Sequence, residues 1–247
     1  MIYEKKINVC YSETGVDGKL KPVSVLNYLQ DITSEHTDEM GVSALDLLPK
    51  NLAWVVFKYQ INIFKYPLWK DELLIRTWRY PVKNLYELRQ FEIIDNTGNL
   101  LISSKSLWIL TSLTTKKPVR LQNNLPLEII KNKQKVITND LTTLPELTNP
   151  DLIRPFTIRM HDLDFNRHVN NSVYLVWGIE SVPEKIITTH RPKEITINYL
   201  SDSVYGDRIT SKTQKLDSNP SATFMHSIIN EHLQKEITRI KTVWELY

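Results

Sequence analysis

The chain contains two copies of one sequence pattern, and this internal repeat limits its fold more than any other feature. Residues 61–73 read INIFKYPLWKDEL and residues 197–209 read INYLSDSVYGDRI, with isoleucine, asparagine and aspartate at equivalent places. Residues 105–110, KSLWIL, match residues 241–246, KTVWEL, at the same separation, since 197 − 61 and 241 − 105 are both 136. Two matches at one separation predict two copies of one structural unit along the chain.

Each copy shows the pattern of one helix followed by strands. Residues 22–40 place Val25, Leu29 and Ile32 at helical spacing. Residues 171–181 are almost entirely apolar, which is typical of a helix that is buried on all sides. Apolar and β-branched runs predict strands at residues 54–64, 72–80, 85–94, 100–111, 194–200, 207–215, 222–230 and 236–246.

A stretch rich in Thr, Asn and Pro, from about residue 123 to residue 155, separates the two copies. This composition is typical of a linker. We therefore expect an N-terminal domain at residues 1–130, a linker at 131–150 and a C-terminal domain at 151–247. The expected fold class is α+β, with two curled antiparallel sheets that are each wrapped around a central helix.

Composition narrows the class of protein. The hydrophobic and charged fractions, 41% and 24%, are ordinary for a soluble globular protein, and a net charge of +3 is too small to indicate nucleic-acid binding. Cys10 has no partner for a disulfide or a thiolate metal cluster. Metal-ligand spacing is also absent among His36, His161, His190, His226 and His232. The chain has no apolar run long enough for an export signal or a membrane span. We expect a cytoplasmic protein without a metal or cofactor, without a nucleic-acid partner and without membrane insertion.

The run DLDFNRHVNN at residues 162–171 is the strongest candidate for chemistry. If the run is extended, Asp162, Asp164, Asn166 and His168 share one face. Asparagine is a good N-cap, so the helix that follows should open its backbone N–H groups onto the same place. A carboxylate, an amide, an imidazole and a positive helix end could together attack a carbonyl group. The alternative is that these polar residues only form turns and caps.

The same run and the helix after it resemble the acyl-ACP thioesterases, which carry a DLDxNxHVNNxxYxxWxxES-P string. The matching positions are Asp162, Leu163, Asp164, Asn166, His168, Val169, Asn170, Asn171, Tyr174, Trp177, Glu180, Ser181 and Pro183. The resemblance extends from near Val9 to the C-terminus. It implies a tandem double hot-dog fold and hydrolysis of the thioester of fatty acyl-ACP to release a free fatty acid. The implied partner is an acyl carrier protein, a strongly acidic protein that holds the acyl chain on a phosphopantetheine arm.

The resemblance also implies the catalytic residues. The family's DxNxH motif falls on Asp164, Asn166 and His168. A further acid comes from a strand motif similar to YRREC, which reads YLSDS at residues 199–203, so that Asp202 replaces the family's glutamate. We expect Asp202 and His168 to activate water, Asn166 to position them and Asp164 to orient the polar network. Either His168 or Asp202 could be the formal base.

Substrate contacts are expected from both domains. Backbone N–H groups near Val169 and Asn170 would stabilise the oxyanion. Ser203, in place of the family's cysteine, is expected to contact the substrate but not to be a nucleophile, because the chain has no G-x-S-x-G elbow. In the first domain the candidate walls of an acyl pocket are apolar side chains, for which core packing is the alternative role. They are Val25, Leu29, Trp54 and Phe57.

The first copy is expected to have no chemistry of its own. Alignment of the two copies by their helix starts places Asp17, Lys19 and Lys21 opposite Asp164, Asn166 and His168. The repeat of the strands places Tyr66 opposite Asp202. The first copy would then lack the amide, the base and the second acid.

Two other functions fit the sequence. An acyl-CoA thioesterase of the same fold would differ only in the carrier of the acyl group. A non-catalytic acyl-binding protein would keep the pocket without the chemistry. A homodimer is possible in each case.

Overall fold

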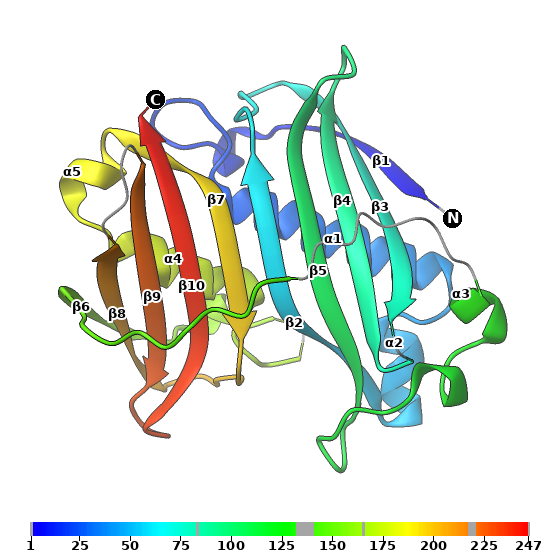
Figure 1. Cartoon of the computed structure of the whole chain (residues 1–247). Coiled ribbons are helices and arrows are strands. Elements are labelled where there is room, and N and C mark those ends of the chain that lie inside the picture. The colour runs from blue at the N-terminus through cyan, green and yellow to red at the C-terminus, as the bar shows by residue number, and fades with distance from the viewer. Residues whose placement is uncertain (1, 83, 132–140, 165, 217–220, 247) are drawn as a thin grey trace. The chain divides into compact units, whose positions relative to one another are not determined.

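The computed structural model describes residues 2–82, 84–131, 141–164, 166–216 and 221–246. The chain divides into two compact units, unit 1 at residues 1–141 and unit 2 at residues 142–247 (Figure 1). Each unit contains one antiparallel sheet with a long helix against one face. Within the expected linker at residues 131–150, residues 132–140 lie outside the described residues.

Unit 1 has its five strands in the order β1-β3-β4-β5-β2. The strands are β1 (Tyr3–Asn8), β2 (Leu52–Ile63), β3 (Glu72–Val82), β4 (Tyr86–Asp95) and β5 (Leu100–Ser112). The short helices of the unit are η1 (Tyr11–Glu13), α2 (Ala44–Leu47), η2 (Leu48–Lys50), η3 (Leu121–Asn123) and α3 (Leu127–Lys131). All four predicted strands of the first copy are confirmed within a few residues.

The long helix of unit 1 is α1 (Pro22–Glu39). It begins at Pro22 because proline's fixed φ suits the first turn, where no N–H donor is needed. Its face toward the sheet carries Val25, Leu29 and Ile32, all buried. Full burial of each such side chain contributes about 1.5–3 kcal/mol, so this face holds the helix on the sheet.

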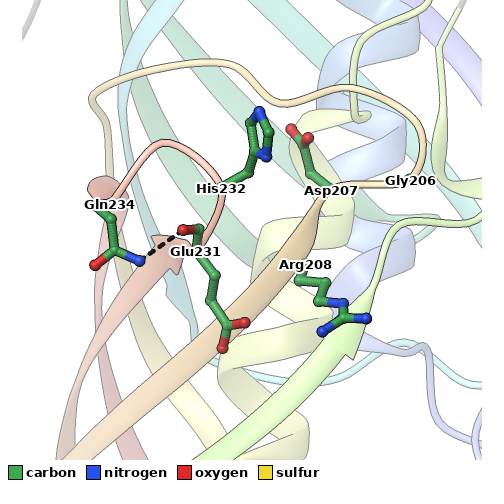
Figure 2. A pocket seen from close by; sticks show the side chains of 6 residues that line it. All are labelled: Gly206, Asp207, Arg208, Glu231, His232 and Gln234. Carbon is green, nitrogen blue, oxygen red and sulfur yellow. Dashed lines mark hydrogen bonds between the residues drawn. The ribbon is translucent and has the colours of Figure 1, made fainter.

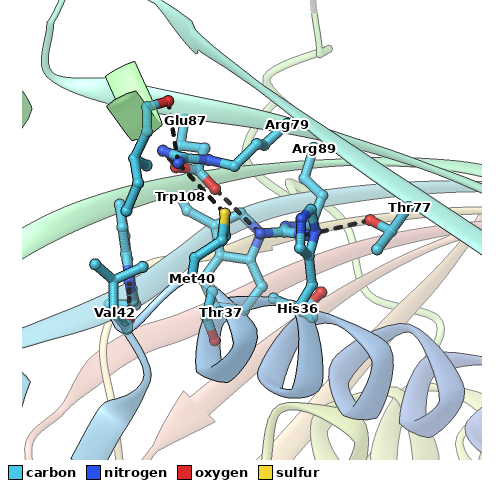
Figure 3. A network of polar contacts seen from close by, with 12 residues as sticks. His36, Thr37, Met40, Val42, Thr77, Arg79, Glu87, Arg89 and Trp108 are labelled. Carbon is cyan, nitrogen blue, oxygen red and sulfur yellow. Dashed lines mark hydrogen bonds and ion pairs between the residues drawn. The ribbon is translucent and has the colours of Figure 1, made fainter. Parts of the chain in front are cut away.

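A buried polar network joins α1 to the sheet of unit 1 (Figure 3). Arg79 on β3 and Arg89 on β4 both pair with Glu87. Arg89 Nη1 also lies 2.9 Å from His36 Nδ1 and donates to Thr77 Oγ1 at 3.3 Å. Burial, together with the charges of Arg89 and Arg79, lowers the pKa of His36 to about 3. His36 is therefore neutral at pH 7 and accepts a hydrogen bond from the guanidinium.

Unit 2 has its strands in the order β7-β10-β9-β8-β6. The strands are β6 (Leu152–Thr157), β7 (His190–Tyr199), β8 (Arg208–Leu216), β9 (Ala222–Asn230) and β10 (Lys235–Leu246). The helices are η4 (Met160–Asp162), α4 (Asn171–Glu180) and α5 (Glu184–Ile187). The predicted strands of the second copy are confirmed, and β6 is an additional edge strand that tolerates Pro155 because an edge needs fewer donors.

Helix α4 lies very close to the sheet of unit 2. A Cβ atom added at Gly178 would lie 3.1 Å from Ile240 Cδ1 and 3.6 Å from His226 Cγ. His226 is fully buried on β9, and its ring nitrogens lie 2.9 Å from Thr213 Oγ1 and 3.1 Å from Thr242 Oγ1. Burial lowers the pKa of His226 to about 3.

The segment before β6 crosses the face of this sheet opposite α4 (Figure 1). Leu144 N donates to Asn198 Oδ1 at 2.7 Å, and Arg239 donates to Leu144 O at 3.1 Å. Lys215 N donates to Asp151 Oδ2 at 2.7 Å. The C-terminal part of the expected linker is thus attached to β7 and β10, and Asp151, the residue that follows it, is attached to β8.

Candidate active site

The run at residues 162–170 is a tight turn between η4 and α4. Leu163 and Val169 form an isolated antiparallel bridge, and Asp164 N donates to His168 O at 2.7 Å. Arg167, with φ of 64°, lies in the left-handed region and reverses the chain. The prediction that Asp162, Asp164, Asn166 and His168 share one face of an extended segment is therefore wrong.

Asp164 shapes this turn with its carboxylate. Its Oδ1 accepts from Asn166 N at 2.8 Å and from His168 N at 3.3 Å. A carboxylate that binds the N–H group two residues ahead is a common device of turns. Asp164 thus orients the backbone of His168, and Asn166 lies exposed at the tip of the turn.

Asp162 lies beneath the turn. Its carboxylate is buried and accepts from Arg159 N at 2.7 Å and from Arg159 Nη2 at 2.8 Å. Burial alone would raise the pKa of Asp162, but the hydrogen bonds from Arg159 lower it below its usual value. Asp162 is therefore an anchor of the loop.

His168 and Asp202 come together from distant parts of unit 2. His168 Nε2 lies 3.5 Å from Asp202 Oδ2, and the two side chains are 42% and 63% exposed. The approach is set by the backbone, because Val169 N donates to Ser203 O at 3.1 Å. This places the segment after β7 beside the turn, in contact with solvent water.

The Ser203 hydroxyl belongs to a different set of contacts. Ser203 is buried, and its Oγ accepts from Asn230 Nδ2 at 3.0 Å. The same amide donates to Asp207 Oδ2 at 2.7 Å. Asn230 and Asp207 thus hold the Ser203 side chain in place through these hydrogen bonds. The sequence analysis gave neither residue a role. Asp207 could have been found from the internal repeat, because Asp71 occupies the equivalent position in the first copy.

The start of α4 is capped as predicted, but the N–H groups of Val169 and Asn170 just before it already have acceptors. Asn170 Oδ1 accepts from Ser172 N at 2.9 Å. Asn170 N donates to Asp162 O at 2.8 Å, and Val169 N donates to Ser203 O. The two donors expected to receive the oxyanion could do so only after one of these bonds opens.

Tyr174 is a further residue beside the site whose role was missed. Its ring is buried and packs edge-on against Trp177 and Tyr199. Burial and the charge of Asp202 raise the pKa of Tyr174 above its usual value. The phenol is thus a neutral hydrogen-bonding group next to the segment that holds Asp202 and Ser203.

The expected acyl-pocket residues lie in unit 1. Val25 and Leu29 are completely buried on α1. Trp54 Nε1 donates to Val42 O at 3.1 Å and the ring packs on the cluster around Leu47. Phe57 is 38% exposed. Their role toward a substrate stays a prediction.

An open hollow lies beside the site, at the ends of β8 and β9 (Figure 2). It has a volume of about 420 Å³ and a mostly polar lining of Gly206, Asp207, Arg208, Glu231, His232 and Gln234. Asp207 connects this hollow through Asn230 to Ser203.

The described residues contain no group of three or more His, Cys, Asp or Glu side chains that could hold a metal ion. Within the same described ranges, none of the helices has the length and apolar character that a membrane crossing requires.

The fold and the site together define the class of protein. Two solved structures share the fold over nearly the whole chain. The acyl-ACP thioesterase from Bacteroides thetaiotaomicron superposes with a TM-score of 0.87 at 21% identity, covering 99% of this chain and 98% of that one. The 12:0-ACP thioesterase from Umbellularia californica superposes with a TM-score of 0.88 at 24% identity, covering 100% and 94%. The chain is a tandem double hot-dog protein, and the predicted fold class is confirmed.

Sequence comparison then identifies the family. Models described as the acyl-ACP thioesterase N-terminal and C-terminal domains match residues 1–129 and 146–246. The chain belongs to the acyl-ACP thioesterase family. The oleoyl-acyl carrier protein thioesterase 2 of Arabidopsis thaliana is 27% identical over 98% of this chain and 76% of its own length. An acyl-[acyl-carrier-protein] hydrolase of Cuphea viscosissima is 29% identical over 81% of this chain, which spans about half (52%) of that relative.

Proposed function

We propose that the chain hydrolyses the thioester of fatty acyl-ACP and releases a free fatty acid. The observation that carries the proposal is the 3.5 Å approach of His168 Nε2 to Asp202 Oδ2 in a position open to water. Membership of the acyl-ACP thioesterase family supports the choice of substrate.

The proposed reaction uses water as the nucleophile. A water molecule held by His168 and Asp202 attacks the carbonyl carbon, and its proton passes to this pair as the C–O bond forms. The tetrahedral intermediate then breaks its C–S bond, and the proton returns to the sulfur of the leaving thiolate. Asp164 holds the backbone of His168, and the exposed amide of Asn166 lies on the same turn, where it can position water or substrate.

The two halves of the chain have different proposed roles. Residues 151–247 carry the catalytic groups. Residues 1–130 shape the acyl pocket, with Val25, Leu29, Trp54 and Phe57 as the candidate walls. Val169, Asn170 and Ser203 are the candidate contacts of the thioester itself.

The test compares carriers directly. Free-thiol release is measured from fatty acyl-ACP and from the same acyl group on coenzyme A. We expect higher kcat/KM with acyl-ACP. A higher value with acyl-CoA would assign the chain to the alternative, an acyl-CoA thioesterase, and acyl binding without thiol release from either carrier would leave a non-catalytic acyl-binding protein.

A cytoplasmic location and a possible homodimer are separate parts of the proposal. The single cysteine, Cys10, is consistent with a reducing compartment. Cell fractionation tests the location, and analytical ultracentrifugation tests the oligomeric state.

A further inference from the structure

Unit 1 repeats the backbone of the active-site loop hydrogen bond by hydrogen bond. Residues 9–21 correspond to residues 158–170, since 158 − 9 and 168 − 19 are both 149. Gly15 N donates to Lys19 O at 2.8 Å, as Asp164 N donates to His168 O at 2.7 Å. Lys21 N donates to Glu13 O at 2.9 Å, as Asn170 N donates to Asp162 O at 2.8 Å. Leu20 N donates to Pro67 O at 2.8 Å, as Val169 N donates to Ser203 O at 3.1 Å. Gly18, with φ of 73°, takes the left-handed place of Arg167.

This correspondence corrects the alignment made from the helix starts, which was two residues out of register. The positions of Asp164, Asn166 and His168 are taken by Gly15, Asp17 and Lys19. Tyr66 stands in the place of Asp202, as the strand repeat predicts. Unit 1 therefore keeps the scaffold of the site without its acid–base groups.

The apolar surroundings of the site are also kept. In unit 2 the exposed apolar side chains around the loop and the segment after β7 are Met160, Leu200, Val204 and Tyr205. Their counterparts in unit 1 are also exposed, namely Tyr11, Phe64, Leu68 and Trp69. Tyr11 and Trp69 are in edge-on contact, with ring centroids 5.6 Å apart. Exposed apolar groups that gather at one place are typical of an interaction surface.

Four positions around this loop carry lysines in unit 1 but not in unit 2. Lys19, Lys21, Lys65 and Lys70 take the places of His168, Asn170, Ser201 and Gly206. Lys70 Nζ lies 4.4 Å from the centre of the Trp69 ring. The carboxylates of Glu13, Asp17 and Asp71 in the same loops accept backbone N–H groups of Cys10, Lys19 and Leu68. We define the lysine–aromatic patch as Tyr11, Lys19, Lys65, Leu68, Trp69 and Lys70.

We propose that the lysine–aromatic patch is a second, non-catalytic docking surface for the acidic acyl carrier protein. The proposal rests on the proposed function, in which the carrier must bring its thioester to the equivalent surface around His168. The patch keeps apolar contacts like those of that surface and carries three ammonium groups, of which Lys19 takes the place of His168. Ammonium groups attract an acidic partner. A carrier held there raises the local concentration of substrate near the enzyme.

The test measures how many carriers bind. Isothermal titration calorimetry uses an acyl carrier protein whose acyl group is attached through a non-hydrolysable amide. We expect two carriers per wild-type chain at low salt. The variant Lys19→Glu/Lys65→Glu/Lys70→Glu should bind one, and Trp69→Ala should weaken the second site at least fivefold. The control Lys116→Glu/Lys117→Glu reverses the charge of two exposed lysines outside the patch and should still bind two.

A second measurement separates this proposal from the proposed function. Hydrolysis of a short acyl thioester of N-acetylcysteamine needs no docking and should be unchanged in the patch variants, which also shows that they are folded. One carrier per wild-type chain, unaffected by the charge reversal, overturns the second surface while leaving the activity intact. Patch-dependent binding to anionic vesicles without carrier binding overturns it in favour of a membrane. Absence of thiol release from acyl-ACP by the wild type is instead a failure of the proposed function.

Discussion

At the scale of single residues, the site combines a carboxylate fixed by hydrogen bonds, Asp164, with a solvent-accessible pair, His168 and Asp202. Asp164 accepts two N–H groups and cannot turn away without opening the loop. Asp202 is mostly exposed, and its Oδ2 lies 3.5 Å from His168 Nε2. The rigid residue therefore positions the imidazole, while the exposed pair is free to exchange a proton with water.

Removal of either member of this pair should stop hydrolysis without unfolding the chain. We expect His168→Ala and Asp202→Ala each to lower kcat by about 10²–10⁴-fold, the usual contribution of one acid–base group. Thermal unfolding should be nearly unchanged, because neither side chain is buried. Asp202→Glu restores the family's residue and should keep most of the activity. Wild-type turnover in a folded alanine variant would remove that residue from the mechanism.

Ser203 should not form a covalent intermediate. Its hydroxyl is buried and accepts from Asn230, so it does not present a free nucleophile. We expect Ser203→Ala to retain substantial activity, with a moderate loss of stability because one N–H group of the Asn230 amide loses its acceptor while the other stays on Asp207. Mass spectrometry after rapid quenching checks this, and an acyl adduct on Ser203 would contradict it.

At the scale of helices and strands, the long periodic elements could be predicted and the irregular ones could not. Strand β1 was missed because its inward side includes Lys5, which pairs with Glu35 of α1 and hides the apolar alternation. The active-site turn was missed because nothing in the sequence marks Arg167 as left-handed. Its residues were found through the family string, and their geometry came only from the structure.

The contact between α4 and β9 should make stability depend on pH. The pKa of His226 is about 3 in the folded chain and about 6.5 when unfolded. Between these values the unfolded chain binds a proton that the folded chain does not. The contribution of neutral His226 to the free energy of unfolding is therefore fully present above about pH 6.5. Below that pH it decreases by about 1.4 kcal/mol per pH unit.

Urea unfolding at pH 8 and pH 5 tests this dependence. As the pH falls from 8 to 5, the free energy of unfolding should decrease by about 2 kcal/mol less in His226→Gln than in the wild type. His36 in unit 1 should contribute a similar loss in both proteins, since its pKa is also lowered to about 3. Equal losses in the two proteins would show that His226 is not buried in its neutral form.

At the scale of the whole molecule, the two units share the backbone hydrogen bonds of one loop, but only unit 2 carries the proposed catalytic side chains. Gly15 has no carboxylate to hold the loop as Asp164 does, and Lys19 and Tyr66 do not supply the imidazole and carboxylate of His168 and Asp202. We expect one active site per chain, counted by titration with a transition-state analogue that competes with hydrolysis. Binding of two analogue molecules per chain, each with an equal share of the inhibition, would contradict this prediction.

Unit 1 should instead decide which acyl chains are accepted. If Leu29 of α1 faces the acyl pocket, Leu29→Ala makes room there, and the ratio of kcat/KM for longer over shorter acyl chains should rise severalfold. The same change costs about 2–5 kcal/mol of stability, because Leu29 is completely buried. Leu73→Ala is the matched control, since Leu73 is also buried in unit 1 but lies on β3, where it pairs with Ile7 of β1 and Asp95 of β4. A similar loss of stability with an unchanged ratio is expected for the control. If both variants change the ratio equally, the effect is general loosening of unit 1, and Leu29 is a core residue only.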